Sequence, residues 1–417
     1  MPATADILIL SNGPGELTTW VRPVLDALRR NRADNLDIRI SLILSPCPNA
    51  TGQEVDIARS HLGIERVQGP EHFWPFLLRG KTAQNWDWRD RGLVIFLGGD
   101  QAFTPIVARR LGYQSLVYGE WDVRWWRWID RFGVMKPEIA ARVPKKYAAK
   151  CTVIGDLMAD ISPNIPETTG EELIALLPGS KAAKLVQGVP FTLAIARSLH
   201  RRRPQTRFVI PVAPTVDLAT LARLADPRHN PLANRFGGIS ANLLQEGDRA
   251  VLQTEDGLQV SLHTRTPAHD LLSRCRFALT TIGANTAELG ALGVPMIVLL
   301  PSYQLDAMRA WDGIPGLLAN LPGVGTTLAK GINAVALWYL DCSHKLLAWP
   351  NIWAGEEIVP ELRGKLKPEM VGDRVLEYLE NPESLQKMRD RLREVRGEPG
   401  AAQKLAQIAI VMLSGRE

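Results

Sequence analysis

The sequence predicts an α/β protein made of two domains, each with a doubly wound parallel sheet that helices cover on both faces. The 417 residues exceed what one hydrophobic core usually organises. Short apolar runs alternate with amphipathic helical segments along most of the chain, which is typical of parallel sheets. A strand, a glycine-containing turn and a helix open the chain, and the same succession returns near its middle. We therefore expect one sheet in each half.

The first half begins with the apolar run DILIL at 6–10, which the turn SNGPGE follows directly. The next ten residues, VRPVLDALRR, form the first helix, because Val21, Val24 and Leu28 fall on one helical face. Further strands of this half are SLILS at 41–45, GLVIFLGGD at 92–100 and QSLVYGE at 114–120.

The second half repeats this order, with LIALL at 173–177, the turn PGSKAAK and a helix. Its helix carries Phe191, Ile195 and Leu199 at intervals of four residues. Further strands are expected at 208–212, 277–281 and 296–300. The polar, proline-containing stretch 162–172 is typical of a linker. We divide the chain into 1–167 and 168–417, and we assign the C-terminal helices that begin at Asn381-Pro382 to the second domain.

Composition and charge narrow the function classes. A hydrophobic content of 46% and a charged content of 22% indicate a folded protein. The net charge is +5, the basic residues are scattered, and no nucleic-acid-reading motif occurs, so no nucleic acid partner is expected. The four cysteines lack the short paired spacing of a metal or redox site. Asp6 within the first apolar run argues against a secretory signal, and a cytoplasmic protein without a spanning helix or a metal is expected.

Ligands of doubly wound sheets bind outside the carboxyl ends of the strands, near helix N-termini that attract anions. In the second half, the loop 178–181 offers a glycine, a hydroxyl and a cation to a phosphate, although such a turn also arises by chance. The turn that follows strand 277–281 offers N–H groups and a carboxylate for ribose hydroxyls, although that carboxylate would also favour the helix dipole. The candidate residues are Gly179, Ser180, Lys181, Gly283, Asn285, Thr286 and Glu288.

In the first half, Asp100 ends the strand at 92–100, and Glu16 lies in the first turn. Either carboxylate can be a helix cap only. If the ligand is an activated sugar, one carboxylate must accept the proton of the attacking hydroxyl. Asp100 is the first candidate for this catalytic role and Glu16 the second. Neither turn carries the Gly-x-Gly-x-x-Gly fingerprint, which disfavours a dehydrogenase.

The segment WPNIWAGEEIVPEL at 349–362 combines two indoles, an amide and three carboxylates, a mixture that suits the wall of a cleft. With ALLPGSK at 175–181 and IGANTAELGALGVPM at 282–296, it resembles the lipid-A-disaccharide synthase family. FLGGD and VIGDLMAD also resemble segments of that family. Its members are inverting glycosyltransferases of the GT-B type, in which two Rossmann-like domains face a cleft and a UDP-sugar is the donor.

The resemblance implies roles for particular residues. It makes Asp100 the catalytic carboxylate, Lys181 a phosphate contact and Glu288 a donor-domain acid. It also places Asn351 at the nucleotide sugar, with Glu357 in the same donor-binding segment. No cofactor is implied, since the UDP-sugar is itself the donor substrate.

Some positions depart from the family pattern. Lys181 replaces an arginine and loses its bidentate fork. Asp156 stands where a histidine is usual, the family's second aspartate is absent after Asp100, and the first glycine loop is one residue shorter. We expect the donor chemistry to be retained, whereas the acceptor need not be a lipid A precursor.

Two tryptophan-rich stretches bear on the acceptor: HFWPFLLRGK at 72–81 and WDVRWWRWIDR at 121–131. Each has three interpretations: core packing with a polar rim, docking on a membrane surface, or stacking on bases. Membrane docking would bring the protein to a lipid-linked acceptor.

The sequence therefore predicts a cytoplasmic glycosyltransferase, peripheral on the inner face of a membrane. It would move a sugar of the N-acetylhexosamine type from UDP to a lipid-linked acceptor with inversion. One alternative is a UDP-sugar 2-epimerase, for which His263 and His269 are the histidines of the second half's cleft region. Another is a catalytically inactive nucleotide-sugar-binding or regulatory protein of the same fold. A homodimer is possible.

Overall fold

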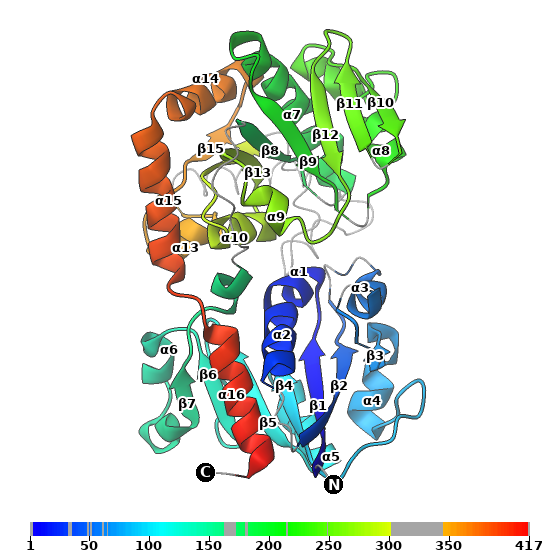
Figure 1. The fold of residues 1–417 in the computed structure, drawn as a ribbon, viewed down its shortest axis with the longest axis vertical. Coiled ribbons are helices and arrows are strands. Elements are labelled where there is room, and N and C mark those ends of the chain that lie inside the picture. Colours follow the sequence, from blue (N-terminus) through cyan, green and yellow to red (C-terminus); the bar gives the residue numbers. More distant parts are fainter. Residues whose placement is uncertain are drawn as a thin grey trace, which may run out of the picture. The chain divides into compact units, whose positions relative to one another are not determined.

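The computed structural model describes residues 3–415 with internal gaps. The gaps are 32–35, 48–49, 51, 61, 65, 162–171, 180–181, 214–215, 248 and 302–344. The chain divides into two compact units, Met1–Ile161 with Arg396–Glu417, and Ser162–Val395 (Figure 1). The change of unit after Ile161 falls near the predicted boundary at 167–168.

Unit 1 is built on a seven-stranded sheet in the order β3-β2-β1-β4-β5-β6-β7, and every neighbouring pair is parallel. Ile7 of β1 lies opposite Ile40 of β2 and Leu93 of β4. The strands are β1 Ala3–Ser11, β2 Leu36–Leu44, β3 Arg66–Gln68, β4 Gly92–Phe96, β5 Gln114–Gly119, β6 Arg131–Val134 and β7 Cys151–Val153.

Helices cover both faces of this sheet, because successive side chains of a strand point to opposite faces. Ile7 and Ile9 belong to one core cluster, whereas Leu8 and Leu10 belong to another. The helices are α1 Pro14–Glu16, the π-helix η1 Leu17–Val21, α2 Arg22–Arg30, α3 Glu54–Ser60, η2 Pro70–His72, α4 Phe73–Arg79, α5 Phe103–Leu111, α6 Pro137–Ala141, η3 Lys145–Lys150, η4 Leu157–Ile161 and α16 Ala401–Ser414.

The last helix corrects the predicted division of the chain. Residues 168–417 were assigned to the second domain, but α16 packs on α2 of unit 1 (Figure 1). Leu405 and Ala409 share a core cluster with Leu28 of α2. The amide groups of Asn31 and Gln403 exchange hydrogen bonds of 2.9 and 2.8 Å. Unit 1 is therefore discontinuous in sequence.

Unit 2 carries an eight-stranded sheet in the order β10-β11-β12-β9-β8-β13-β14-β15. Its strands are β8 Leu173–Leu177, β9 Arg207–Pro211, β10 Ala241–Glu246, β11 Arg249–Thr254, β12 Gln259–His263, β13 Phe277–Thr281, β14 Met296–Pro301 and β15 Glu361–Gly364. The pairs β10–β11 and β11–β12 are antiparallel, and the remaining pairs are parallel. The antiparallel extension was not foreseen in the sequence.

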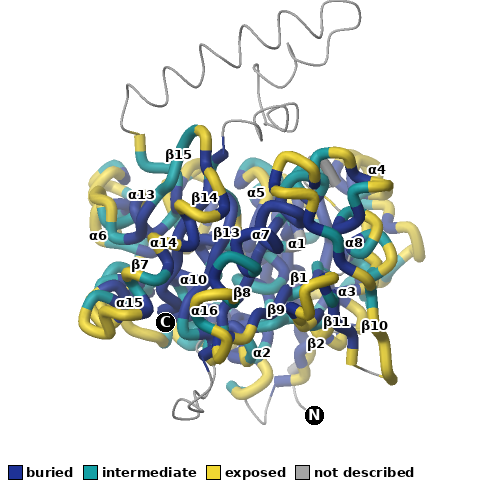
Figure 2. Tube along the Cα trace, turned by 90° about the horizontal axis from the view of Figure 1, so that it is seen from above, coloured by how far each residue is buried: buried dark blue, intermediate teal, exposed yellow. Residues whose placement is uncertain are grey.

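The helices of unit 2 bury the apolar faces that the sequence indicates. Phe191, Ile195 and Leu199 of α7 are fully or almost fully buried, as predicted. The helices are α7 Ala182–Arg202, α8 Leu218–Leu224, η5 Pro231–Phe236, α9 His269–Leu272, α10 Ala284–Ala291, α13 Trp349–Ala354, α14 Pro368–Leu379 and α15 Pro382–Arg396. Figure 2 shows burial along the strands and exposure along outer helix surfaces and loops.

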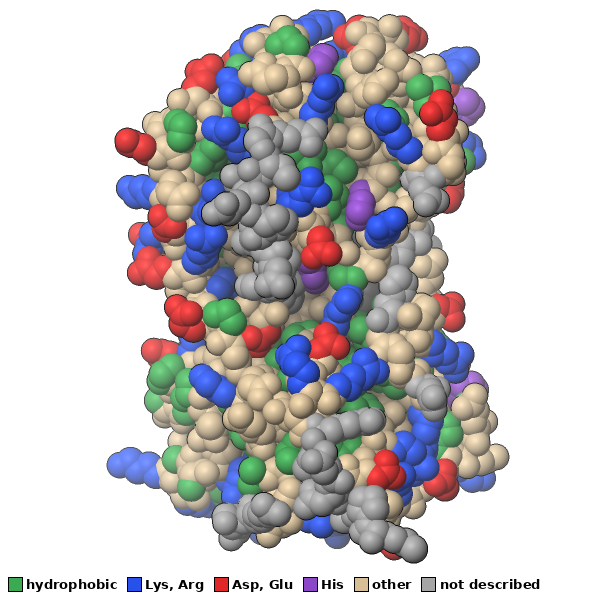
Figure 3. All heavy atoms as spheres, in the orientation of Figure 1, with side chains coloured by type: hydrophobic (Ala, Val, Ile, Leu, Met, Phe, Trp, Pro, Cys, Tyr) green, Lys and Arg blue, Asp and Glu red, His purple; other side chains and the backbone are tan. Residues whose placement is uncertain are grey.

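The surface carries charge of both signs. In Figure 3, lysine and arginine side chains are spread over the visible face among acidic ones and form no single basic patch. Among the residues that the structure describes, no helix combines the length and apolar character needed to cross a membrane. Likewise, no group of three or more His, Cys, Asp or Glu in the described ranges is placed to hold a metal ion.

Candidate functional site

The strand order marks one place in each unit where a ligand is expected. In unit 1, β1 lies between β2 and β4, so the strand order reverses its direction at β1. In unit 2, β8 lies between β9 and β13 in the same way. Crevices form outside the carboxyl ends of the strands at such topological switch points. The candidate residues are therefore considered around β1 and β4, and then around β8 and β13.

The two glycine loops of unit 2 meet at Lys184. Its Nζ donates a 2.8 Å hydrogen bond to the carbonyl of Ile282, at the end of β13. A Cβ on Gly179 would come within 2.8 Å of the Lys184 Cβ, and φ is +117° at Gly179, so both space and backbone favour glycine there. A Cβ on Gly283 would lie 3.8 Å from Nζ. The structure thus brings Gly179 and Gly283 together around a cation.

Lys184 was not among the candidates from the sequence, which selected the nearer Lys181. Ser180 and Lys181 lie outside the described residues. The turn PGSKAAK contains both lysines, and its spacing alone does not distinguish them. Lys184 lies on the first turn of α7, where its side chain reaches the neighbouring strand end. Only the pairing of β8 with β13 reveals this contact.

The first turn of α10 carries two candidate residues, the buried Thr286 and the half-buried Asn285. Thr286 is buried, and its hydroxyl donates to the Gly283 carbonyl at 2.9 Å while accepting from the Trp349 N–H at 3.1 Å. That hydroxyl links α13 to α10 and so has a packing role, and the ligand contact of Thr286 stays a prediction. Asn285 is half-buried on the same turn.

Glu288 lies against a histidine from a neighbouring loop. The Glu288 Oε1 and the His269 Nε2 are 3.0 Å apart, although the geometry is not that of an aligned hydrogen bond. His269 begins α9 and is largely buried, and Glu288 is a quarter exposed. The carboxylate that the sequence selected therefore lies beside an imidazole ring.

The segment 349–362 is held together by its own polar groups. The Asn351 amide nitrogen donates to the carbonyl of Val359 at 2.8 Å and to Glu361 Oε1 at 2.9 Å. Its oxygen accepts from the N–H groups of Ile358 and Val359 at 2.8 and 2.9 Å. Both amide hydrogens and both lone pairs are used, and Asn351 is fully buried. The structure thus gives Asn351 a structural role within the segment, and its contact with the nucleotide sugar stays a prediction.

The remaining residues of this segment pack or face solvent. The rings of Trp349 and Trp353 stack with centroids 5.9 Å apart. Pro350 lies so close to α10 that a Cβ on Gly290 would come within 2.8 Å of it. Glu357 is exposed, and its place at the donor stays a prediction. The two indoles thus belong to the short helix α13, which packs on α10, and the three carboxylates lie in the turn after it and at the start of β15.

In unit 1, Asp100 lies just beyond the carboxyl end of β4. It is exposed, and its Oδ1 accepts a 2.9 Å hydrogen bond from the N–H of Ala102, ahead of α5. Gly98 and Gly99 before it have φ of +137° and +99°. The second carboxylate oxygen points to no partner among the described residues. Asp100 thus caps the turn and still presents an oxygen to solvent.

Glu16 lies beside the same turn. Side-chain atoms of Asn12 and Glu16 would come within 2.7 and 3.1 Å of a Cβ on Gly98. Burial raises the pKa of Glu16. The Oδ1 atom of Asn12 is buried and has no hydrogen-bond partner in the described part of the chain. A π-helix follows Glu16 directly, and such turns are frequent at functional sites.

Glu120 is a third carboxylate of this region that the sequence did not single out. It follows β5 directly, and its pKa is raised to about 7 by burial and by the charges of Asp156 and Glu16, which Arg396 and a hydrogen bond from Trp121 oppose in part. The strand QSLVYGE ends in this glutamate, so the rule that selected Asp100 at the end of β4 also applies to it. A group that titrates near neutral pH suits proton transfer.

A buried ion pair lies next to Glu120. The Arg396 guanidinium contacts Asp156, and both side chains are almost fully buried. Burial raises the pKa of Asp156 in spite of that guanidinium. Asp156 also accepts a 2.9 Å hydrogen bond from the N–H of Met158. Asp156, which stands where a histidine is usual in the family it resembles, is therefore paired with Arg396, the residue at which the chain returns to unit 1.

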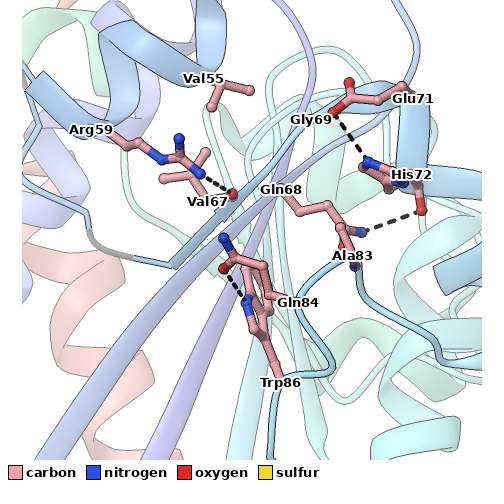
Figure 4. Close-up of a pocket in the computed structure, with 10 residues that line it drawn as sticks. All are labelled: Val55, Arg59, Val67, Gln68, Gly69, Glu71, His72, Ala83, Gln84 and Trp86. Atoms are coloured by element: carbon pink, nitrogen blue, oxygen red, sulfur yellow. Dashed lines mark hydrogen bonds and ion pairs between the residues drawn. The ribbon is translucent and has the colours of Figure 1, made fainter.

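A separate hollow of about 240 Å³ lies at the sheet edge near β3 (Figure 4). Its polar side chains bind neighbouring protein atoms. Arg59 donates to the Val67 carbonyl at 3.3 Å, Gln68 accepts from the Ala83 N–H at 2.8 Å, and Gln84 accepts from the Trp86 indole at 3.0 Å. This hollow holds none of the candidate site residues.

No model of a known protein family matches the sequence. Curated relatives include the lipid-A-disaccharide synthase of Geobacter sulfurreducens, 24% identical over 332 residues, or 74% of this chain and 71% of the relative. A protein of the same name from Anaeromyxobacter sp. strain K is 28% identical over 238 residues, or 56% of this chain and 48% of the relative.

Solved structures share the fold at low sequence identity. A putative UDP-N-acetylglucosamine 2-epimerase from Listeria monocytogenes has a TM-score of 0.55 and 13% identity, covering 100% of this chain and 98% of that one. The UDP-GlcNAc 2-epimerase of Neisseria meningitidis, solved with UDP-GlcNAc, has a TM-score of 0.50 and 12% identity, covering 97% of this chain and 99% of that one.

Two Rossmann-like units with glycine loops at their switch points place the protein in the two-domain α/β class of the GT-B fold, as the sequence predicted. The sequence relationship narrows this class further. The sequence is similar to lipid-A-disaccharide synthases at 24–28% identity over 56–74% of the chain, so the resemblance seen in its motifs is confirmed.

Proposed function

We propose that the protein is a hexosyltransferase that moves a sugar, of the N-acetylhexosamine type, from UDP to a lipid-linked acceptor with inversion. The observation that carries the proposal is the relationship to the synthases over 74% of the chain. The fold alone does not separate transferases from epimerases, because both reactions use UDP-sugars on this architecture. No metal or organic cofactor enters the proposal, since the UDP-sugar is the donor substrate.

The donor would bind at the carboxyl ends of β8 and β13. Helix N-termini at α7 and α10 offer N–H groups to a diphosphate, and Lys184 adds a positive charge between the two loops. These groups would stabilise the negative charge that develops on UDP as it departs. Glu288 would accept hydrogen bonds from ribose hydroxyls, with His269 beside it.

Asp100 would act as the general base. The acceptor hydroxyl oxygen forms a bond to the anomeric carbon while the bond from that carbon to the UDP oxygen breaks. UDP leaves with the electron pair, and the hydroxyl proton passes to the Asp100 carboxylate. Attack on the face opposite to UDP inverts the anomeric configuration. Glu16 is the second candidate for this base, and burial raises its pKa, which makes its ionised form a stronger base.

The first test is replacement of the proposed base. Transfer from UDP-N-acetylglucosamine to acylated glucosamine acceptors is measured by mass spectrometry for wild type, Asp100→Asn and the control Asp90→Asn. Asp90 is an exposed aspartate of the same unit. We expect transfer by Asp100→Asn to fall by about 10²–10⁴-fold, the usual contribution of a general base, with UDP binding retained. Undiminished transfer by this variant would reject Asp100 as the base.

The second candidate function is UDP-sugar 2-epimerisation, which the contact of His269 with Glu288 favours. Incubation with the UDP-sugar alone separates the two reactions, because an epimerase changes the sugar without an acceptor. Binding of UDP in a thermal-shift assay, with neither transfer nor epimerisation, would instead support an inactive nucleotide-sugar-binding protein.

A lipid-linked acceptor would bring the protein to the inner face of a membrane.

A further inference from the structure

The loop between β5 and β6 presents large aromatic rings to solvent. Trp121, Trp125 and Trp128 are 43%, 40% and 57% exposed. The rings of Trp125 and Trp128 lie against each other with centroids 5.7 Å apart and planes tilted by 41°. Leaving such apolar area in water is unfavourable, and a gathered exposed patch usually marks an interaction surface.

Hydrogen bonds hold this loop in place from both sides. The Gln101 side chain donates to the Asp122 carbonyl at 3.0 Å and accepts from the Arg124 N–H at 2.9 Å. Lys150 Nζ donates to the carbonyls of Trp126 and Ile129 at 2.9 and 2.6 Å. The loop is therefore braced while it keeps its rings outside the core.

The backbone at Trp125 also favours this display. Its φ is +62°, in the left-handed region that bulky residues rarely adopt. Such a conformation costs free energy and persists where the surroundings enforce it, often at functional positions. The exposure of Trp125 is therefore a built feature of the loop.

Exposed cations lie in the same loop and on the neighbouring segment η3. Arg124 and Arg127 alternate with the tryptophans and are exposed, with Arg124 facing Asp122 at 3.3 Å. Lys145 and Lys146 are exposed on η3, the segment that Lys150 ties to the loop. We define the tryptophan surface as Trp121, Arg124, Trp125, Arg127, Trp128, Lys145 and Lys146.

The other tryptophan-rich segment, 72–81, is mostly core. Phe73 and Phe76 of α4 are fully buried, whereas Trp74 and Leu78 are exposed. Trp74 packs edge-on against Phe73 and Phe103, with ring centroids 5.5 and 6.1 Å away. Of the two segments that the sequence proposed for a membrane surface, 121–131 shows more aromatic area together with cations.

We propose that the tryptophan surface docks the protein on a membrane containing anionic lipids. Indole rings favour the headgroup region, and arginine and lysine beside them attract anionic headgroups. The tilted contact between Trp125 and Trp128 leaves no parallel slot for a nucleic acid base between the two rings. This inference rests on the proposed function in one respect, since a lipid-linked acceptor is presented at such a membrane.

The test is vesicle co-sedimentation of the full chain with phosphatidylcholine vesicles, with and without phosphatidylglycerol. The test variant combines Trp125→Asn with Trp128→Ser, because asparagine tolerates the left-handed backbone at position 125. The matched control is Trp74→Ser, an exposed tryptophan of the same unit. We expect binding that requires phosphatidylglycerol and weakens with salt, and a loss of about tenfold or more in the double variant only, which corresponds to ~1.4 kcal/mol.

Three outcomes would overturn the proposal: wild type that ignores both vesicles, a double variant that binds as wild type does, or Trp74→Ser with the larger loss. Binding of single-stranded DNA that the double variant loses, without vesicle binding, would assign the surface to nucleic acid. The proposed function is followed separately through stabilisation by UDP and transfer to a short-chain, water-soluble acceptor. These two readouts should be the same in the double variant and in wild type.

Discussion

At the residue scale, Glu16, Glu120 and Asp156 share one electrostatic environment near the carboxyl ends of β1 and β5. Burial raises the pKa of each, and the charges of Glu16 and Asp156 raise that of Glu120 further. The positive charge of Arg396 opposes this rise in pKa at Glu120 and Asp156, and Lys136 adds to that effect at Asp156. Since the three carboxyl groups interact, the protonation of Glu120 reports on the whole group.

Glu120→Gln should change how stability depends on pH. A carboxyl group whose pKa is raised to about 7 on folding stays protonated in the folded state while it ionises in the unfolded state near 4.5. Its contribution to the free energy of unfolding is complete below pH 4.5 and is lost as the pH rises from 4.5 to about 7. This contribution amounts to about 3 kcal/mol. The free energy of unfolding of the variant should therefore fall less than that of wild type between these pH values.

Urea unfolding followed by circular dichroism, at several pH values within the window, measures this difference. Glu138→Gln is the control, because Glu138 is exposed on α6 of the same unit. Parallel pH profiles for Glu120→Gln and wild type would contradict the assigned environment of Glu120.

At the element scale, segment 349–362 shows how a motif can fix a structure without touching a ligand. Glu361 Oε1 accepts from the N–H groups of Leu347 and Ala348 at 2.9 and 2.7 Å, as well as from Asn351. These bonds set the start of α13, and Asn351 holds the chain that returns to β15. The loop after β13 leads directly into α10, and α13 is fastened to the first turn of α10.

Asn351→Ala should destabilise unit 2 by about 2–4 kcal/mol, because it leaves buried N–H and C=O groups of residues 358 and 359 without partners. Thermal unfolding measures the loss, with Ile352→Ala on the exposed side of the same helix as control. The UDP affinity of the variant, measured below its unfolding temperature, distinguishes a structural role of Asn351 from a contact with the ligand. A variant of unchanged stability that has lost UDP binding would restore the ligand contact that the sequence suggested.

Local patterns predicted the elements well, and long-range contacts explain what they missed. The mainly apolar runs at 6–10, 173–177 and 277–281 are largely buried parallel strands, because a strand covered on both faces is mostly apolar. Lys184 and Glu120 were missed because their environments arise from strands that are distant in sequence. The partner of α16 was missed for the same reason, since an amphipathic helix does not specify which sheet it will cover.

At the scale of the whole molecule, the chain builds unit 1, then unit 2, and returns to complete unit 1 with α16. Arg396 and Asp160 hold this return. Arg396 pairs with Asp156, and the Asp160 carboxylate accepts from the N–H groups of Gly400 and Ala402 at the start of α16. Because α16 belongs to the core of unit 1, the stability of the first 161 residues depends on the last helix.

Leu405→Ala tests this dependence. Leu405 is fully buried among Val134, Ile154 and other residues of unit 1, so truncation should cost about 2–5 kcal/mol. Hydrogen exchange should show faster exchange in β5 and β6, while β8 and β13 keep their protection. Val411→Ala is the control, since Val411 is half exposed on the same helix. Equally accelerated hydrogen exchange in both units would mean that they unfold as one cooperative body. Loss of protection confined to β8 and β13 would assign α16 to the second domain, as the sequence predicted.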